Sequence, residues 1–147
     1  MVHIIHNNGD ENISSTQVDN AILWLNEAYS NSGESFNPDG TEVPIQFCLA
    51  KKDPDGEFTE GVNYVQNSLT DMLVPSQDLA LKDLIRWNPL EYLNIWVVKS
   101  VTREDDSPGV VGYSTFPDSH GIGPLDARHR DCIKHPVRWG PEVLSCV

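Results

Sequence analysis

Two apolar stretches in the second half of the chain constrain its fold more than any other feature. They are Tyr92-Leu-Asn-Ile-Trp-Val97 and Gly112-Tyr-Ser-Thr-Phe-Pro117. Both are rich in β-branched and aromatic residues and too short for a typical helix, so each predicts a strand. We expect a buried strand over 93–98 and a second strand over 110–116. A charged loop over 102–109 would join them.

A long helix is predicted near the start of the chain. Ser14 is a favourable N-cap, Gln17 completes a capping box, and Ile13 with Val18 can form a hydrophobic staple. Gly33 can take the positive φ that ends a helix. The expected apolar side recurs at helical spacing over Val18, Ile22, Leu25 and Tyr29.

Weaker patterns place the remaining elements. Strands are expected over 2–6 and 43–50, and a shorter helix over 76–87, with an irregular connection over 57–75. The apolar side of the shorter helix is expected at Leu79, Leu84 and Ile85. The order is therefore strand, helix, strand, helix, strand, strand. It predicts an α/β fold in which a long helix backs a mixed, twisted sheet of about four strands, with the last two open to antiparallel pairing.

Composition narrows the class of protein. A chain of 147 residues predicts one domain, and its net charge of −12 disfavours nucleic acid as a partner. No apolar run reaches the roughly 18–20 residues of a membrane-spanning helix, so no membrane partner is expected. The acidity is uneven: residues 1–117 hold 18 Asp/Glu and 6 Lys/Arg, whereas residues 118–147 hold 4 of each. The composition changes near residue 118.

Catalytic motifs are sparse. Ser114 follows Gly112 as in a nucleophile elbow, but the closing glycine is missing, and the serine lies within a predicted strand. No histidine is followed by glutamate, so the H-E-x-x-H zinc motif is absent from the sequence. The chain itself therefore predicts no catalytic residue.

Histidine and cysteine leave only weak metal hypotheses. His129, Cys132 and His135 have spacing that could hold zinc, although the fourth ligand is undefined, so no metal site is assigned. His3 and His6 are three apart in a strand, which places them on opposite faces as one surface and one packed histidine. Cys48 is expected to be buried in the strand over 43–50.

Five segments in order resemble the pappalysin family, metzincin zinc peptidases of the pregnancy-associated plasma protein A type. They are Val2–Gly9, Asn12–Glu27, Ile45–Gly56, Tyr92–Val97 and Gly112–Pro117. The resemblance implies the N-terminal subdomain of a secreted zinc metalloendopeptidase that acts on peptide or protein substrates. It also implies that the last strand lines the substrate cleft and binds an extended peptide by main-chain pairing through Val111, Gly112, Tyr113 and Ser114.

The family pattern continues into a zinc-binding helix, and this chain departs from it near residue 121. We therefore expect a truncated metzincin subdomain over 1–118 and an atypical, irregular tail over 119–147, frameshifted or disordered. Zinc is expected for full-length family members and is not supported by this chain. The leading hypothesis is an inactive peptidase fragment. The alternatives are a non-catalytic peptide-binding module that uses the cleft-edge strand, and a zinc-binding tail on a reused scaffold.

Overall fold

A computed structural model describes residues 1–105, 111–114 and 131–134 of the chain. Its elements are β1 (Val2–His6), α1 (Ser15–Tyr29), the 3₁₀ turn η1 (Gly33–Ser35), β2 (Val62–Gln66), β3 (Asp71–Val74), α2 (Asp78–Leu84), β4 (Asn94–Val97), β5 (Ser100–Arg103), β6 (Gly112–Ser114) and β7 (Asp131–Lys134).

The main sheet has five strands in the order β2-β1-β4-β7-β6. The first four run parallel, and β6 runs antiparallel to β7 at the edge. This confirms the predicted α/β class with a mixed sheet. β7 belongs to the segment after residue 118 and lies between β4 and β6, so those two strands are antiparallel without being neighbours. A separate pair, β3 and β5, is parallel.

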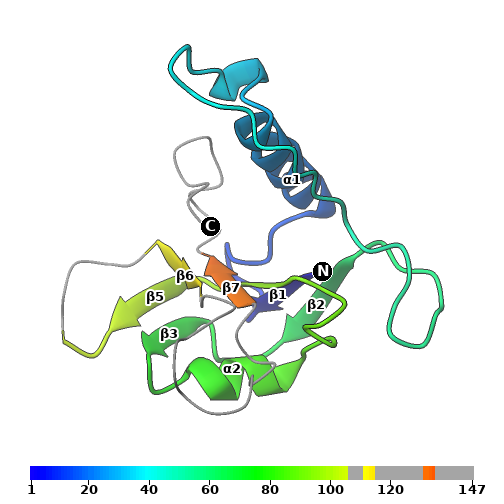
Figure 1. Ribbon diagram of the computed structural model, residues 1–147. Coiled ribbons are helices and arrows are strands. Elements are labelled where there is room, and N and C mark those ends of the chain that lie inside the picture. The colour runs from blue at the N-terminus through cyan, green and yellow to red at the C-terminus, as the bar shows by residue number, and fades with distance from the viewer. Residues whose placement is uncertain (106–110, 115–130, 135–147) are drawn as a thin grey trace, which may run out of the picture.

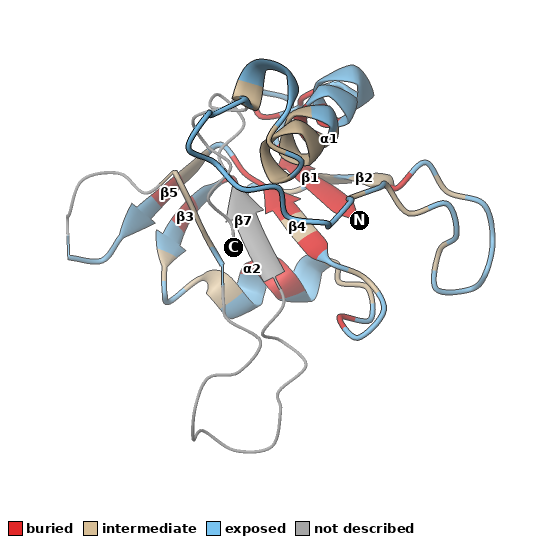
Figure 2. Cartoon of the chain, turned by 45° about the horizontal axis from the view of Figure 1, so that its top comes forward, coloured by how far each residue is buried: buried red, intermediate tan, exposed pale blue. Residues whose placement is uncertain are grey.

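The sheet is covered on both faces (Figure 1). On the face toward α1, Val18 and Ile13 pack with alternate residues of the central strands; we call Val2, Ile4, Ile13, Val18 and Val97 the α1-side cluster. On the opposite face lie α2 and the β3–β5 pair. Ile5, Met72, Leu81, Trp96, Val98 and Val101 form the α2-side cluster. Buried positions concentrate on β1 and β4 (Figure 2), because central strands are covered on both faces.

The start of α1 has the capping arrangement that the sequence predicts. The Ser14 hydroxyl accepts from the Gln17 backbone N–H at 3.3 Å, and the Gln17 side chain accepts from the Ser14 backbone N–H at 3.0 Å. Gly33 has the expected positive φ, +58°, but it begins η1. The positive-φ residue directly after the helix cap is Asn31, with a φ of +48°. The local pattern was sufficient here because every group involved lies within one helical turn.

Removal of this cap is expected to cost about 1 kcal/mol of unfolding free energy, because Ser14→Ala removes the side-chain acceptor of the Gln17 N–H. Urea denaturation followed by circular dichroism measures the change. Ser15→Ala is the matched control, since Ser15 is exposed and one position inside the helix. Equal losses in the two variants would contradict a specific capping role for Ser14.

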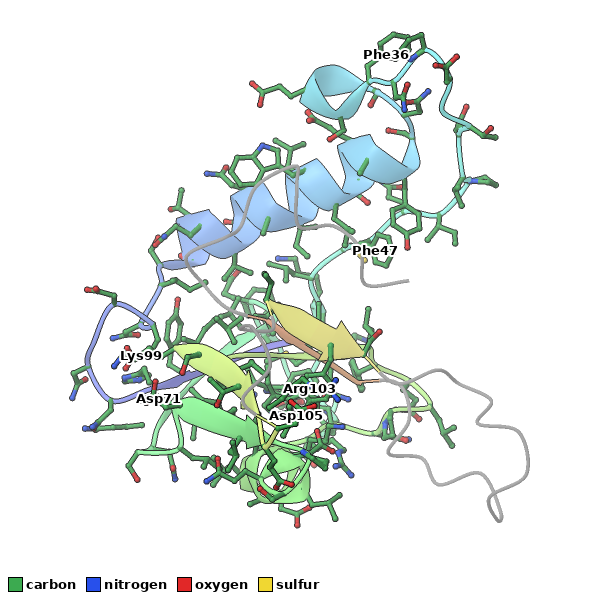
Figure 3. All side chains as sticks on the ribbon, turned by 90° about the vertical axis from the view of Figure 1, so that its left-hand side faces the viewer. Phe36, Phe47, Asp71, Lys99, Arg103 and Asp105 are labelled. Atoms are coloured by element: carbon green, nitrogen blue, oxygen red, sulfur yellow. The ribbon has the colours of Figure 1, made fainter. Side chains whose placement is uncertain are left out.

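The expected strand over 43–50 is wrong. This segment is extended, but α1 rather than a neighbouring strand satisfies much of its backbone. The Phe47 N–H donates to Asn26 Oδ1 at 2.7 Å, Asn26 Nδ2 donates to the Phe47 carbonyl at 2.9 Å, and the Val43 N–H donates to the Tyr29 carbonyl at 2.7 Å. Cys48 is consequently exposed rather than buried. Phe47 lies beneath α1, whereas Phe36 lies beyond the end of α1, far from the sheet (Figure 3).

Four strands were not predicted where they occur. β2 and β3 lie in the expected irregular connection, β5 overlaps the expected charged loop, and β7 lies in the segment that was expected to be an irregular tail. These strands are only four or five residues long and mix polar with apolar positions, so their pattern alone is ambiguous. The shorter helix exists, but its buried leucine is Leu81, while Leu79 and Leu84 are exposed. No helix in the described ranges is long and apolar enough to cross a membrane.

Candidate functional site

The predicted substrate-binding residues gather at one edge of the main sheet. Gly112, Tyr113 and Ser114 form β6, and Val111 directly precedes it. Gly112 pairs with Lys134, Tyr113 with Ile133 and Ser114 with Cys132. Among the described strands, β6 pairs only with β7 and leaves its outer side as the sheet edge. An edge of this kind offers backbone N–H and carbonyl groups to an extended chain.

The Tyr113 side chain lies on the α2 face of β6. Its ring packs against the α2-side cluster, and its hydroxyl donates a hydrogen bond to the carboxylate of Asp78. Because side chains alternate along a strand, Gly112 and Ser114 face the opposite side. Ser114 is exposed, whereas Gly112 is half-buried and carries no side chain, so that side is open at Ser114. The strand can therefore offer main-chain groups with few side chains beside them.

The Asp78 carboxylate serves two elements at once. Its Oδ1 accepts from Tyr113, and its Oδ2 lies 3.0 Å from Lys82 Nζ one helical turn further along α2. The Lys82 side chain is only 3% exposed. A buried ammonium requires a counter-charge, and Asp78 supplies it. The same ion pair fixes the position of the Asp78 carboxylate on α2. The sequence does not reveal this pair, because nothing in the pattern around residues 78–82 indicates that the lysine is buried.

His3 belongs to β1, its side chain lies on the α2 face of the sheet, and it is fully buried. Asn94 donates through Nδ2 to the Trp87 carbonyl at 2.9 Å, so its Oδ1 is the acceptor for His3 Nε2 at 3.0 Å. His3 is thus the neutral tautomer with its proton on Nε2. Its Nδ1 is buried without a hydrogen-bond partner. Burial, the largest cause, lowers the pKa of His3 to about 4.

The packed position predicted for one of the two histidines is confirmed at His3, whereas the predicted surface position of the other is wrong. His6 is also buried, because its ring lies against Tyr64 and its Nδ1 accepts from the Asn8 N–H at 3.3 Å. The two rings point to opposite faces of β1, as strand alternation requires. They therefore do not form a common site.

Glu11 organises the turn that follows β1 and was not singled out by the sequence. It is almost fully buried, and its Oε1 accepts from the backbone N–H groups of Asn7 at 2.7 Å and Gly9 at 3.1 Å. The Asn7 bond is the largest cause that holds the pKa of Glu11 below its usual range. A side chain at Gly9 would collide with this carboxylate, since its Cβ would lie 2.4 Å from Glu11 Oε2.

The described residues do not form a zinc site. No group of three or more His, Cys, Asp or Glu side chains converges within the described part of the chain. His129 and His135 lie outside the described residues. The Cys132 backbone belongs to β7, and its side chain is not described. The hypothesis of a zinc-binding tail is therefore untested, and we derive no step through a metal.

Comparisons with known proteins identify solved structures with a similar fold. No family model matches the sequence, and no curated protein matches it. Mature mirolysin of Tannerella forsythia in complex with a cleaved peptide is similar, with a TM-score of 0.72 and 26% identity over 92% of this chain and 50% of that one. A promirolysin mutant gives 0.68 and 27% over 92% and 44%, and mirolysin with compound 9 gives 0.69 and 28% over 92% and 50%.

Mirolysin is a metzincin-type metallopeptidase. The mixed sheet and its helices therefore match the N-terminal part of a metzincin catalytic domain. This chain spans about half the length of the mirolysin structures.

Proposed function

We propose that this chain forms the N-terminal part of a metzincin-type peptidase domain and binds an extended peptide along the outer edge of β6. The antiparallel edge strand carries the proposal. It ends an otherwise parallel sheet, and among the described strands only β7 pairs with it, so its outer side is unpaired there. The similarity to mirolysin in complex with a cleaved peptide supports the same role for a peptide or protein partner here.

The finer assignment is a secreted zinc metalloendopeptidase of the pappalysin subfamily, in which zinc is expected for the full-length protein. For the chain of 147 residues, we propose peptide binding without cleavage, because the sequence holds no H-E-x-x-H motif. We also propose that the segment over 119–147 is a frameshifted tail. The expectation that it is irregular is wrong at β7, which pairs with both β4 and β6. Resequencing the locus and translating it in all three frames would test the frameshift. If none of the frames encodes a zinc motif downstream, the proposal of a frameshift is contradicted.

Main-chain pairing makes a specific prediction about the peptide. In a β-ladder, alternate residues of the added strand direct their N–H groups toward the protein. A fluorescein-labelled ten-residue peptide, selected on an array for binding to this chain, should therefore lose affinity when alternate amides are N-methylated. Methylation of the intervening amides should change affinity by less than about threefold. Fluorescence anisotropy of the methylated series measures this periodicity, and uniform effects along the peptide would contradict pairing at a strand edge.

A protein-side variant locates the binding edge. Val111→Pro constrains the backbone at the entry to β6 and should weaken peptide binding at least tenfold. Tyr64→Pro is the matched control at the opposite edge of the sheet. The Val2 N–H donates to the Gly61 carbonyl and the Asn67 N–H to the His6 carbonyl, so the alternating ladder directs the Tyr64 N–H outward. Equal losses in the two variants would place the peptide elsewhere.

A cleavage assay separates the enzyme from the binding module. The labelled peptide should remain intact after prolonged incubation with the chain, with and without added zinc. Mass spectrometry of the peptide detects any product. Cleavage that a chelator abolishes would contradict the binding-only function and favour a peptidase whose metal ligands lie outside the described residues.

A further inference from the structure

We propose that Tyr113 and Asp78 form a brace that fixes the register of β6 and so positions the edge for its peptide. The inference rests on the proposed function, because it assigns a positioning role at the same strand. Neither side chain needs to touch the peptide. The Tyr113 hydroxyl points to Asp78 on the α2 face, whereas the proposed contact uses main-chain groups at the outer edge.

The brace is anchored in the best-packed part of the molecule. Leu81 of α2 is fully buried, and the Trp96 indole donates to the Ile85 carbonyl at 3.0 Å, which ties the end of α2 to central strand β4. Asp78 is held at the other end of the same helix by Lys82 at 3.0 Å. The carboxylate that receives the Tyr113 hydroxyl is therefore fixed relative to the sheet.

β6 needs such an anchor because its own pairing is short. It has three residues, and among the described strands only β7 pairs with it. A shift by one residue would turn every side chain of the strand to the other face. It would carry the Tyr113 ring away from the α2-side cluster and break the bond to Asp78. The side chain thus selects the single register in which Gly112 and Ser114 face the open side.

The brace predicts that the Tyr113 hydroxyl affects peptide affinity beyond its effect on stability. Tyr113→Phe keeps the ring and removes only the donor, so the fold should survive. We expect peptide binding to weaken about 3- to 10-fold, since part of a hydrogen bond to a charged acceptor is lost in the binding-competent register. Asp78→Asn should weaken binding at least as much, because it also removes the counter-charge of Lys82. The double variant should bind peptide no more weakly than Asp78→Asn alone.

Thr102→Val is the matched control. It removes a hydroxyl that donates to the Met72 carbonyl at 3.1 Å in the β3–β5 pair, which is a separate sheet from the one that contains β6. This variant should lose comparable stability in urea and keep its peptide affinity. If Thr102→Val weakens binding as much as Tyr113→Phe, or if the effects of Tyr113→Phe and Asp78→Asn simply add, the positioning role is overturned.

Hydrogen exchange in the peptide-free protein separates this inference from the proposed function. The protected amides of β6 should exchange faster in Tyr113→Phe, while those of β1 keep their rates. Unchanged exchange in β6 would overturn the brace, whether or not peptide binds. If the wild-type chain binds no peptide, the proposed function fails, and faster exchange in β6 would still support the brace as the anchor of the strand.

Discussion

Trp96→Ala should remove about 4 kcal/mol from the free energy of unfolding, the largest single effect expected for this chain. Trp96 is the largest fully buried side chain, and it joins β4 to α2 within the α2-side cluster. Its truncation leaves a cavity and also leaves the Ile85 carbonyl without its indole donor at 3.0 Å. Urea denaturation followed by tryptophan fluorescence and circular dichroism measures the loss through the transition midpoint.

Two controls separate the contributions at Trp96. Trp96→Phe keeps most of the ring but loses the indole donor, so a loss of about 1–2 kcal/mol is expected. Leu23→Ala changes a side chain that is 54% exposed on α1 and should stay within about 0.5 kcal/mol of the wild type. A loss below 1 kcal/mol for Trp96→Ala would mean that α2 does not pack against the sheet as described.

Acid should destabilise the protein through His3 over the window between pH 6.5 and about 4. Burial lowers the pKa of folded His3 to about 4, whereas the unfolded chain titrates near 6.5. Between these values the unfolded state binds the proton and the folded state does not, so stability falls as the pH falls. The stabilising contribution is complete above pH 6.5, and about 2–3 kcal/mol should be lost by pH 4.5.

His3→Gln isolates this effect. The glutamine amide can donate to Asn94 Oδ1 as His3 Nε2 does, but it cannot titrate. The stability difference between the wild type and His3→Gln should therefore shift by about 2–3 kcal/mol between pH 7 and pH 4.5, as urea midpoints at each pH would show. A constant difference across this range would mean that the pKa of His3 is the same in the folded protein as in the unfolded chain.

The candidate site was partly accessible from the sequence. The stretch Gly112–Ser114 has the short β-type pattern that predicts a strand, and the family resemblance placed that strand at a cleft edge. The structure supports the edge position, since β6 is the last strand of the sheet. Peptide binding at that edge stays a prediction. Asp78 and Lys82 could not be found this way, because their importance comes from contact with Tyr113, 35 residues away.

The sequence by itself determined the elements whose causes are local. The capping box at Ser14, the turn at Gly33 and the apolar runs of β1 and β4 each depend on residues within a few positions of one another. Only the tertiary structure decided whether an extended segment becomes a strand. Residues 43–50 have the pattern of a strand, yet Asn26 satisfies part of their backbone, whereas the less apolar β2 gains a full ladder from β1. Strand formation requires a partner for backbone groups, and that partner is set by the fold.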